Sequence, residues 1–163
     1  GEVVFFRPIK AIDESMMQDF FYSLSDRSIY QRYFSPLRAM PHQTIQAMTT
    51  IDYEQDMAIV GVVRKEGRER IIAVGRYGLL GGASELAEMA FTVRDDWQNI
   101  GIGTYLLHCL AEIGKERGVR AFTAEILENN GPMLTILNRA DHPVECVYED
   151  GVYIATMALE QHG

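Results

Sequence analysis

The sequence is short of cysteine and has no excess of positive charge. Its two cysteines, Cys109 and Cys146, have neither the spacing of metal ligands nor the number needed for a disulfide framework. We therefore expect no bound metal and a reducing, cytoplasmic location. The 15 basic residues are outnumbered by 23 acidic ones, and the net charge of −8 argues against general binding to nucleic acid. This charge is compatible with a cationic acceptor such as an amine.

Long apolar runs and internal repeats are also absent. No stretch approaches the roughly 20 apolar residues that a membrane-spanning helix needs, and no signal peptide is visible. We therefore expect no contact with a membrane. The 163 residues, of which 47% are apolar and 23% are charged, are typical of one globular domain over residues 1–163.

Apolar residues recur with two different periods, and these periods divide the chain into helices and strands. In one predicted helix, Met17, Phe20, Phe21 and Leu24 follow each other at intervals of one to three residues. Runs of β-branched residues bounded by turn residues indicate strands. We predict strands at Val3–Arg7, Met57–Val63, Ile71–Tyr77, Glu85–Arg94, Ala121–Leu127, Val144–Glu149 and Val152–Leu159, and helices at Glu14–Leu24, Ser25–Phe34, Pro41–Thr49, Ile102–Arg117 and Pro132–Arg139.

The order of these elements favours a mixed sheet. Three strands with short links, between residues 57 and 94, favour an antiparallel meander. The strand–helix–strand unit over residues 85–127 favours a parallel crossover. The fold class is therefore α/β (α+β), with a mostly antiparallel sheet and helices on both faces. Turns or helix ends are expected at Arg64–Arg70, Gly81–Ser84, Gly118 and Asp150-Gly151, and Asp13 is expected to cap the first helix.

A glycine-containing turn, Gln98-x-x-Gly101-x-Gly103, lies between the strand Glu85–Arg94 and the helix Ile102–Arg117. The first N–H groups of a helix are unpaired and lie at the positive end of its dipole, so they can bind an anion. Glycines let a phosphate approach the backbone closely. Ordinary tight turns have the same glycine spacing, so the pattern alone leaves both interpretations open. It matches neither a dinucleotide fingerprint nor a P-loop, which ends in Gly-Lys-Ser/Thr.

Further short motifs accompany this turn, namely Arg7-Pro8, Tyr30-x-Arg32-Tyr33-Phe34, Ile51-Asp52-Tyr53, Ala87-Glu88-x-Ala90 and Val93-Arg94-Asp95-Asp96. The strand, turn and helix resemble the acetyl-CoA signature of the GNAT N-acetyltransferases. The other motifs resemble the acetyltransferase domain of Pat-type protein lysine acetyltransferases. The resemblance extends over nearly the whole chain. It implies a splayed central pair of parallel strands, acetyl-CoA or a close acyl-CoA as cosubstrate, and an amine acceptor, first of all a protein lysine.

The resemblance also implies the residues that bind the cofactor. Backbone groups of Phe91, Thr92 and Val93 would pair with the pantetheine arm, and an N–H near Val93 would polarise the thioester carbonyl. Asn130 would contact the cofactor near the thiol, although an N-cap of the next helix is an equal alternative. The pyrophosphate would be bound by Gln98 and by the amides of Asn99, Ile100, Gly101, Ile102, Gly103 and Thr104.

Glu88 matches the general-base glutamate of the lysine-acetylating relatives. Such a base is needed because a lysine ammonium, with a pKa of about 10.4, is not nucleophilic until it loses a proton. Strand alternation places Glu88, Ala90 and Thr92 on one face of the strand. Met89, Phe91 and Val93 lie on the other face. We expect partial burial of Glu88, which would raise its pKa towards that of a useful base. The alternative is an ordinary solvated carboxylate, and Glu85 is the nearby second choice.

The sequence departs from the family pattern where many relatives have a tyrosine that protonates the leaving thiolate. The matching residue here is Leu137, so no such acid can be assigned. This departure leaves open a non-catalytic module that senses acyl-CoA. Transfer to a small amine or to a protein N-terminus is a further alternative. Tyr30, Arg32, Tyr33 and Phe34 could line an acceptor channel or belong to the core, and Cys109 is expected to be a core residue.

Overall fold

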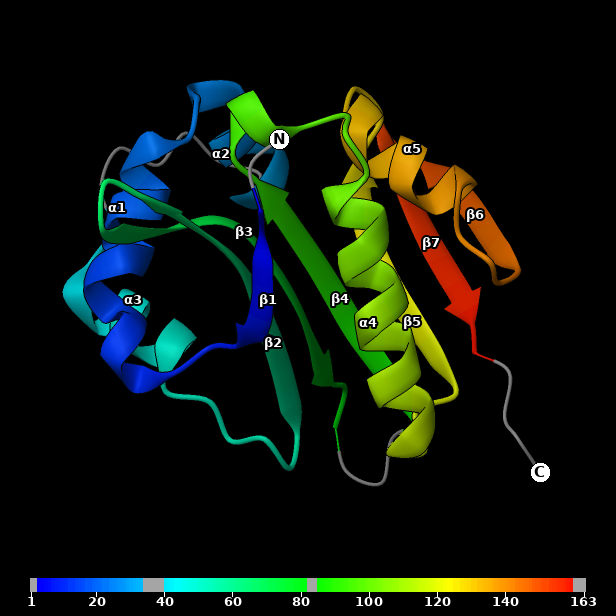
Figure 1. The fold of residues 1–163 in the computed structure, drawn as a ribbon. Helices are drawn as coiled ribbons and strands as arrows, with labels where there is room; N and C mark the ends of the chain where they lie inside the picture. The colour runs from blue at the N-terminus through cyan, green and yellow to red at the C-terminus, as the bar shows by residue number, and fades with distance from the viewer. Residues whose placement is uncertain (1–2, 34–39, 82–84, 160–163) are drawn as a thin grey trace.

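The structure, a computed structural model, is built on one mixed sheet and describes residues 3–33, 40–81 and 85–159. Within these residues the sheet has seven strands in the order β1-β2-β3-β4-β5-β7-β6 (Figure 1). The strands are β1 (Phe5–Pro8), β2 (Asp56–Lys65), β3 (Arg68–Leu79), β4 (Leu86–Val93), β5 (Ala121–Leu127), β6 (Val144–Glu149) and β7 (Val152–Ala158). The helices are α1 (Glu14–Ser23), α2 (Asp26–Tyr33), α3 (His42–Thr49), α4 (Ile102–Glu116) and α5 (Gly131–Asn138), with short 3₁₀ helices η1 (Ala11–Asp13) and η2 (Asp95–Trp97).

The strand pairing confirms the predicted topology. Strands β2, β3 and β4 form the antiparallel meander. Strand β4 is parallel to β5, and α4 connects the two. The remaining pairs, β1 with β2, β5 with β7 and β6 with β7, are antiparallel. The mixed, mostly antiparallel sheet is therefore confirmed.

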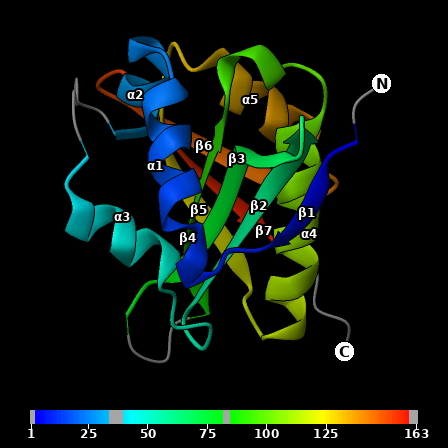
Figure 2. The same ribbon diagram turned by 60° about the vertical axis from the view of Figure 1, so that its left-hand side comes forward.

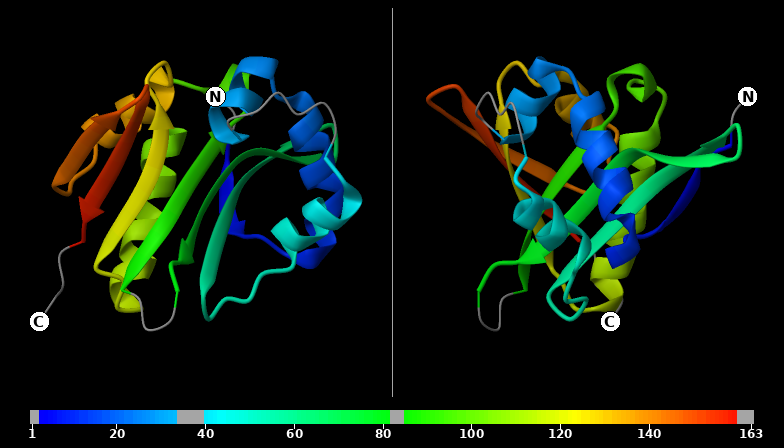
Figure 3. Two further views of the ribbon diagram at one scale, coloured as in Figure 1. Left: turned by 180° about the vertical axis from the view of Figure 1, so that it is seen from behind. Right: turned by 90° about the vertical axis from the view of Figure 1, so that its left-hand side faces the viewer.

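Helices cover both faces of the sheet, as predicted (Figures 2 and 3). On one face, α1, α2 and α3 bury Phe20, Phe21, Ile29 and Ile45 against β2 and β3. On the other face, the apolar side of α4 forms a second core with β2, β3, β4, β5, α5 and β7. Gly118 follows α4 with a φ of 84°, as expected for a residue that ends a helix. Among the described residues, no helix has both the length and the apolar character needed to cross a bilayer.

Two hairpins depend on pairs of residues with positive φ. Asp150-Gly151, with φ values of 50° and 84°, forms the predicted turn between β6 and β7. The turn between β2 and β3 is Glu66-Gly67, with φ values of 53° and 77°, so the predicted seven-residue turn Arg64–Arg70 was wrong. Both strands continue through the charged residues because these pair across the hairpin, as the 3.1 Å contact of Arg64 with Glu69 illustrates. The predicted turn at Gly81–Ser84 lies largely outside the described residues.

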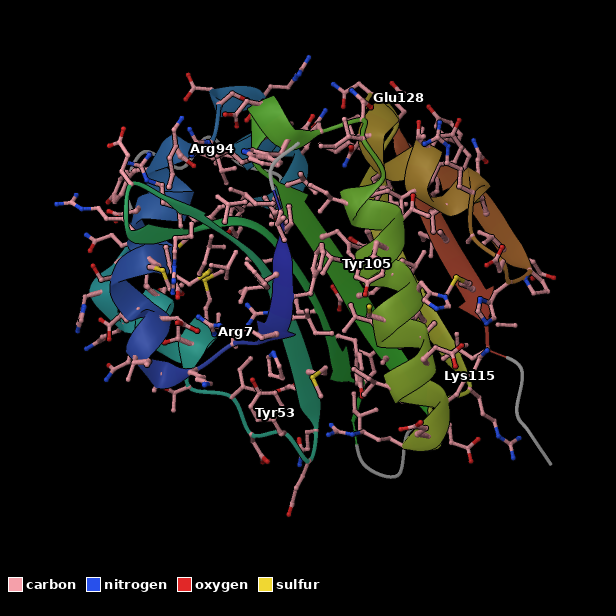
Figure 4. All side chains as sticks on the ribbon, viewed as in Figure 1. Arg7, Tyr53, Arg94, Tyr105, Lys115 and Glu128 are labelled. Carbon is pink, nitrogen blue, oxygen red and sulfur yellow. The ribbon has the colours of Figure 1, made fainter. Side chains whose placement is uncertain are left out.

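Asp13 precedes α1 but does not cap it with its side chain, so the capping prediction was wrong. Its carboxylate instead accepts hydrogen bonds from both terminal nitrogens of Arg7, at 2.7 and 2.8 Å, and from the Lys10 N–H at 2.8 Å. The Asp13 side chain is 1% exposed. The hydrogen bond from Arg7 lowers the pKa of Asp13 below its usual value of 3.8. This pair ties the start of α1 to β1, where Arg7 is labelled in Figure 4.

Candidate acyl-CoA and acceptor site

Strands β4 and β5 pair at one end and separate towards the other. Only Leu86–Glu88 of β4 pair with Ala121–Thr123 of β5. Beyond these three pairs, Met89–Val93 and Ala124–Leu127 each have one edge without a strand partner among the described residues. Their other edges are paired with β3 and β7. The predicted splay is therefore confirmed, and each side of the gap presents free backbone groups.

A cavity of about 350 Å³ occupies this gap. Arg94 and Glu128, which follow β4 and β5, lie at the same end of the molecule and mark the open end (Figure 4). An extended ligand that enters there can pair with the free edge of β4 as an added strand. Every predicted cofactor-binding residue except the exposed Ile100 lines the cavity: Phe91, Thr92, Val93, Gln98, Asn99, Gly101, Ile102, Gly103, Thr104 and Asn130.

The start of α4 points unpaired amides towards this cavity. The first hydrogen bond of the helix joins the Tyr105 N–H to the Gly101 carbonyl, at 3.0 Å. The N–H groups of Ile102, Gly103 and Thr104 precede it and have no acceptor within the helix. No side chain caps this end, and the first turn contains no acidic residue. The arrangement therefore suits an anion such as a pyrophosphate.

The two glycines of the turn have different roles. Gly101 has a φ of 94°, and a β-carbon at this residue would contact nothing within 4 Å, so its backbone conformation is what requires glycine. A β-carbon on Gly103 would overlap Cδ1 of Ile136. Gly103 thus permits the close approach of α5 to α4. This packing role was not expected from the sequence, which suggested only an approach by phosphate.

The Gln98 side chain holds the turn in place. Its Nε2 donates to the Val93 carbonyl at 2.9 Å and to the Ser28 hydroxyl at 3.3 Å. The amide nitrogen is thus already hydrogen-bonded to the end of β4 and to α2. Binding of pyrophosphate by Gln98 stays a prediction, and in this conformation the side chain positions the turn.

Asp95 extends this network to the start of α2. Its carboxylate accepts hydrogen bonds from the Ser25 N–H at 3.0 Å, the Ser25 hydroxyl at 2.7 Å and the Ser28 hydroxyl at 3.0 Å. Burial alone would raise the pKa of Asp95, but these hydrogen bonds outweigh it and lower the pKa. On the other side of the gap, the Gln31 side chain donates to the Asn129 carbonyl at 3.3 Å. Helix α2 therefore contacts the segments that follow β4 and β5.

Asn130 fits both alternatives drawn from the sequence. It is the N-cap of α5, and its Oδ1 accepts a hydrogen bond from the Met133 N–H at 3.1 Å. It also lines the cavity. The N-cap is thus confirmed, and contact with the cofactor stays a prediction.

Glu88 lies where the gap begins. It is the last residue of β4 that pairs with β5, opposite Thr123, and it lines the cavity. Its side chain is exposed, so the expected partial burial was wrong. The cause is that the β4 face which carries Glu88 loses its helix cover at this end of the strand, whereas Met89 on the opposite face is buried beneath α4. Glu85, the second choice, forms an exposed ion pair with Arg120 at 2.9 Å.

Residues 27–136 match the sequence profile of the Acetyltransferase (GNAT) family. The chain belongs to the GNAT family. The acetyltransferase Pat of Mycolicibacterium smegmatis is 30% identical over 139 residues, which are 85% of this chain and 41% of that protein. An acetyltransferase of Pseudomonas aeruginosa is 27% identical over 120 residues, which are 74% of this chain and 64% of that protein. The chain thus spans less than two thirds of the length of either curated relative.

The solved GNAT domain of S. lividans PAT has the same architecture. It superposes with a TM-score of 0.84 and 29% sequence identity, over 94% of this chain and 89% of that chain. The splayed strands, the uncapped start of α4 and the cavity are what a GNAT domain needs to hold an acyl-CoA. Within the described residues, no group of three or more His, Cys, Asp and Glu side chains is placed to bind a metal ion.

The family tyrosine that protonates the thiolate has no counterpart at its usual place. Leu137 is 5% exposed and belongs to the core between α4, α5 and the sheet. Cys109 packs against the same core, as expected, and is not part of the cavity lining. None of the described α5 residues that line the cavity, Pro132, Met133, Thr135 and Ile136, has an acidic side chain.

Helix α2 contributes residues that the sequence singled out only in part. Arg32 and Tyr33 line the cavity, whereas Tyr30 is exposed and Phe34 lies outside the described residues. Ser28 and Gln31 also line it and were missed. The signal was present, because Ser28, Gln31 and Arg32 are spaced three and four residues apart and so lie on one helix face. The hydrogen-bond partners of Ser28 and Gln31 are 67 to 98 residues away in sequence, which no local pattern reveals.

Proposed function

We propose that this GNAT domain transfers an acetyl group from acetyl-CoA to an amine, and that the amine is a protein lysine side chain. The single observation that carries this proposal is the position of Glu88. It stands at the closed end of a gap whose open end has an anion site. Similarity to Pat and to S. lividans PAT supports a lysine acceptor.

The gap has the length for an extended cofactor arm. From Val93 to Glu88 the strand advances five residues, or about 17 Å. With the pyrophosphate at the amides of Ile102–Thr104, the pantetheine runs along the free edge of β4 towards Glu88. Its amide groups replace the hydrogen bonds that β5 no longer supplies. The thioester then lies near Ala90, so the donor to its carbonyl oxygen is a β4 backbone N–H close to Ala90 rather than the N–H near Val93 that the resemblance implies.

Glu88 acts as the base for the incoming amine. Its carboxylate, on the face with Ala90 and Thr92, accepts the proton that the ammonium group must lose before attack on the thioester carbon. The C–N bond forms, the C–S bond breaks, and the CoA thiolate leaves and takes up a proton. A thiolate, with a free pKa of about 8.5, is a good leaving group, so the absence of a tyrosine at Leu137 slows this step only modestly.

The test is the rate of CoA release by wild type and Glu88→Gln with a panel of lysine-containing peptides, free amines and protein N-termini. Glu88→Gln should lower kcat by about two to four orders of magnitude, with less loss at high pH, where more amine is already neutral. The affinity for acetyl-CoA should stay nearly unchanged, because it depends on the turn and the β4 backbone.

Glu85→Gln is the matched control, since Glu85 lies three residues away and outside the cavity lining. It should remain close to wild type. A wild-type protein that binds acetyl-CoA but acetylates no amine would favour the acyl-CoA sensor, which the buried Leu137 makes the second candidate. Transfer to small amines alone would reject the protein lysine. We also propose a cytoplasmic location, which the two free cysteines support.

A further inference from the structure

On the face of β4 that carries Glu88, two arginines have no carboxylate partner within ion-pair distance in the described part of the chain. Arg76 of β3 stands in register with Ala90 of β4, on the same face as Glu88. Arg32, in the last turn of α2, lines the main cavity, and both arginines line a smaller apolar pocket that adjoins it. The two cavities share Arg32, Tyr33, Ala90 and Thr92 in their linings.

No described carboxylate lies within ion-pair distance of either arginine, although Glu88 and Glu125 line the same main cavity as Arg32. The one hydrogen bond of the Arg76 guanidinium that the structure defines goes to the Met48 carbonyl, at 2.8 Å. Residues 34–39, which follow α2 in the sequence, include no Asp or Glu.

An unpaired guanidinium in apolar surroundings is costly. Burial lowers the pKa of Arg76, and the charge of Arg32 lowers it further. Asp56 acts on Arg76 in the opposite sense, but only from beyond ion-pair distance. The pocket around Arg76 is otherwise lined mainly by apolar residues of α1, α2 and α3. This pocket, of about 20 Å³, has room for little more than one water, so an anion would relieve this cost from the adjoining main cavity, at the wall of Ala90 and Thr92 that the two cavities share.

Tyr33 completes the group. The guanidinium carbon of Arg32 lies 4.9 Å from the centre of the Tyr33 ring, which restricts the orientation of the arginine. Burial raises the pKa of the Tyr33 hydroxyl, while the charges of Arg32 and Arg76 both oppose this increase. The hydroxyl is therefore within electrostatic reach of both arginines and remains a neutral hydrogen-bond donor at neutral pH.

From this geometry we infer that Arg32 and Arg76 bind a carboxylate of the acceptor, so that the preferred acceptor carries a carboxylate close to its reacting amine. The inference rests on the proposed transfer to an amine. Ala90 and Glu88 are two residues apart, or about 7 Å along the strand. An acceptor whose carboxylate lies beside Ala90 can therefore place its amine at Glu88 if the two groups are only a few bonds apart, as in a free amino acid. A protein lysine can do the same if an acidic residue lies next to it.

The carboxylate can belong to a free amino acid or to an acidic residue next to a protein lysine, and two pairs of acceptors distinguish these sources. One pair is a free amino acid and its carboxamide, and the other is a lysine peptide with Asp or with Asn next to the lysine. For the source that is used, kcat/KM should be about 10- to 100-fold higher for the acid than for the amide, as expected for a charge-assisted hydrogen bond.

Arg32→Gln should remove most of this preference, and Arg32→Lys should restore part of it. Arg27→Gln is the matched control, because Arg27 is on the same helix but is exposed and outside both cavity linings. Arg76→Lys should reduce the preference in the same way. A purely structural arginine would lower the rates for acid and amide alike and leave their ratio unchanged.

Equal kcat/KM values for acid and amide in both pairs would overturn the inference while leaving the proposed acetyl transfer intact. If no amine is acetylated, the proposed function fails. The carboxylate site can then be tested by itself, by titrating the CoA-saturated protein with the N-acetylated amino acid and with its carboxamide. Tighter binding of the acid, lost in Arg32→Gln, would support the site, and equal binding would reject it.

Discussion

Replacing Gln98 distinguishes a residue that positions the turn from one that binds the cofactor. Gln98→Ala removes the hydrogen bonds to the Val93 carbonyl, at 2.9 Å, and to the Ser28 hydroxyl, at 3.3 Å. A typical hydrogen bond contributes about 0.5–1.5 kcal/mol, and the longer bond should lie near the lower limit. We therefore expect a loss of about 1–2 kcal/mol in the free energy of unfolding, measured by urea denaturation.

The affinity for acetyl-CoA should fall by no more than about thirtyfold, because about 2 kcal/mol is the most that a misplaced turn can lose. Ser28→Ala removes the bond from Gln98 and the charge-assisted bond to Asp95, so its loss of stability should be at least as large, whereas its effect on acetyl-CoA affinity should be smaller because the bond of Gln98 to Val93 remains. The double variant should lose less than the sum of the two single variants, since Ser28 and Gln98 share a hydrogen bond. Gln18→Ala, at an exposed residue of α1, is the control and should match wild type.

Calorimetric titration with acetyl-CoA and urea denaturation of the four variants and of wild type complete the test. The positioning role is refuted if Gln98→Ala weakens binding by more than a hundredfold without any loss of stability. That result would mean that the side chain leaves Val93 in the complex and donates directly to the pyrophosphate.

Three further variants test the packing and the charges that support the site. Gly103→Ala should destabilise the protein by about 1–3 kcal/mol in urea, because its β-carbon overlaps Ile136, and adding Ile136→Val should restore part of the loss. Gly101→Ala should cost about 1 kcal/mol and weaken acetyl-CoA binding in calorimetry, since alanine disfavours a φ of 94°. Asp13→Asn should lower stability at pH 7 by about 2–3 kcal/mol, because it leaves Arg7 without its anionic partner. Since the pKa of Asp13 is lowered in the folded state, wild type has this contribution above pH 3.8 and loses it as the pH falls through the folded-state pKa, so urea midpoints of Asp13→Asn should depend less on pH in that range.

The framework of the site could be predicted from the sequence because its signals are local. Periodicity located β4, α4 and β5, and the turn from Gln98 to Gly103 marked the crossover between them. The splay followed from the family resemblance rather than from the residues, since no local pattern states where two strands stop pairing. The same applies to Glu88, whose exposure depends on how far the helices α1–α3 extend over β4.

What could not be predicted depends on contacts between distant segments. Gln98 and Ser28 are 70 residues apart, and the contact of Gly103 with Ile136 joins two helices. Asp13 has the residue type and place of an N-cap, but Arg7 offers it a stronger, charge-assisted pair of hydrogen bonds. Local preference was overruled in each case by a partner that only the fold brings near.

The short seam between β4 and β5 joins two hydrogen-bonded blocks, β1 to β4 and β5 with β7 and β6. A ligand that inserts along the seam is in effect an eighth strand supplied from solution. It stabilises the folded chain by RT ln(1 + [L]/Kd), or about 2.7 kcal/mol when its concentration is a hundred times Kd. When opening and closing are fast relative to cleavage, proteolysis depends on the fraction of molecules that are transiently unfolded. The resistance of the protein to proteases should therefore increase and decrease with the acyl-CoA concentration. Proteolysis over a range of acetyl-CoA concentrations would measure this dependence, so abundance of the protein would report the supply of its own cosubstrate.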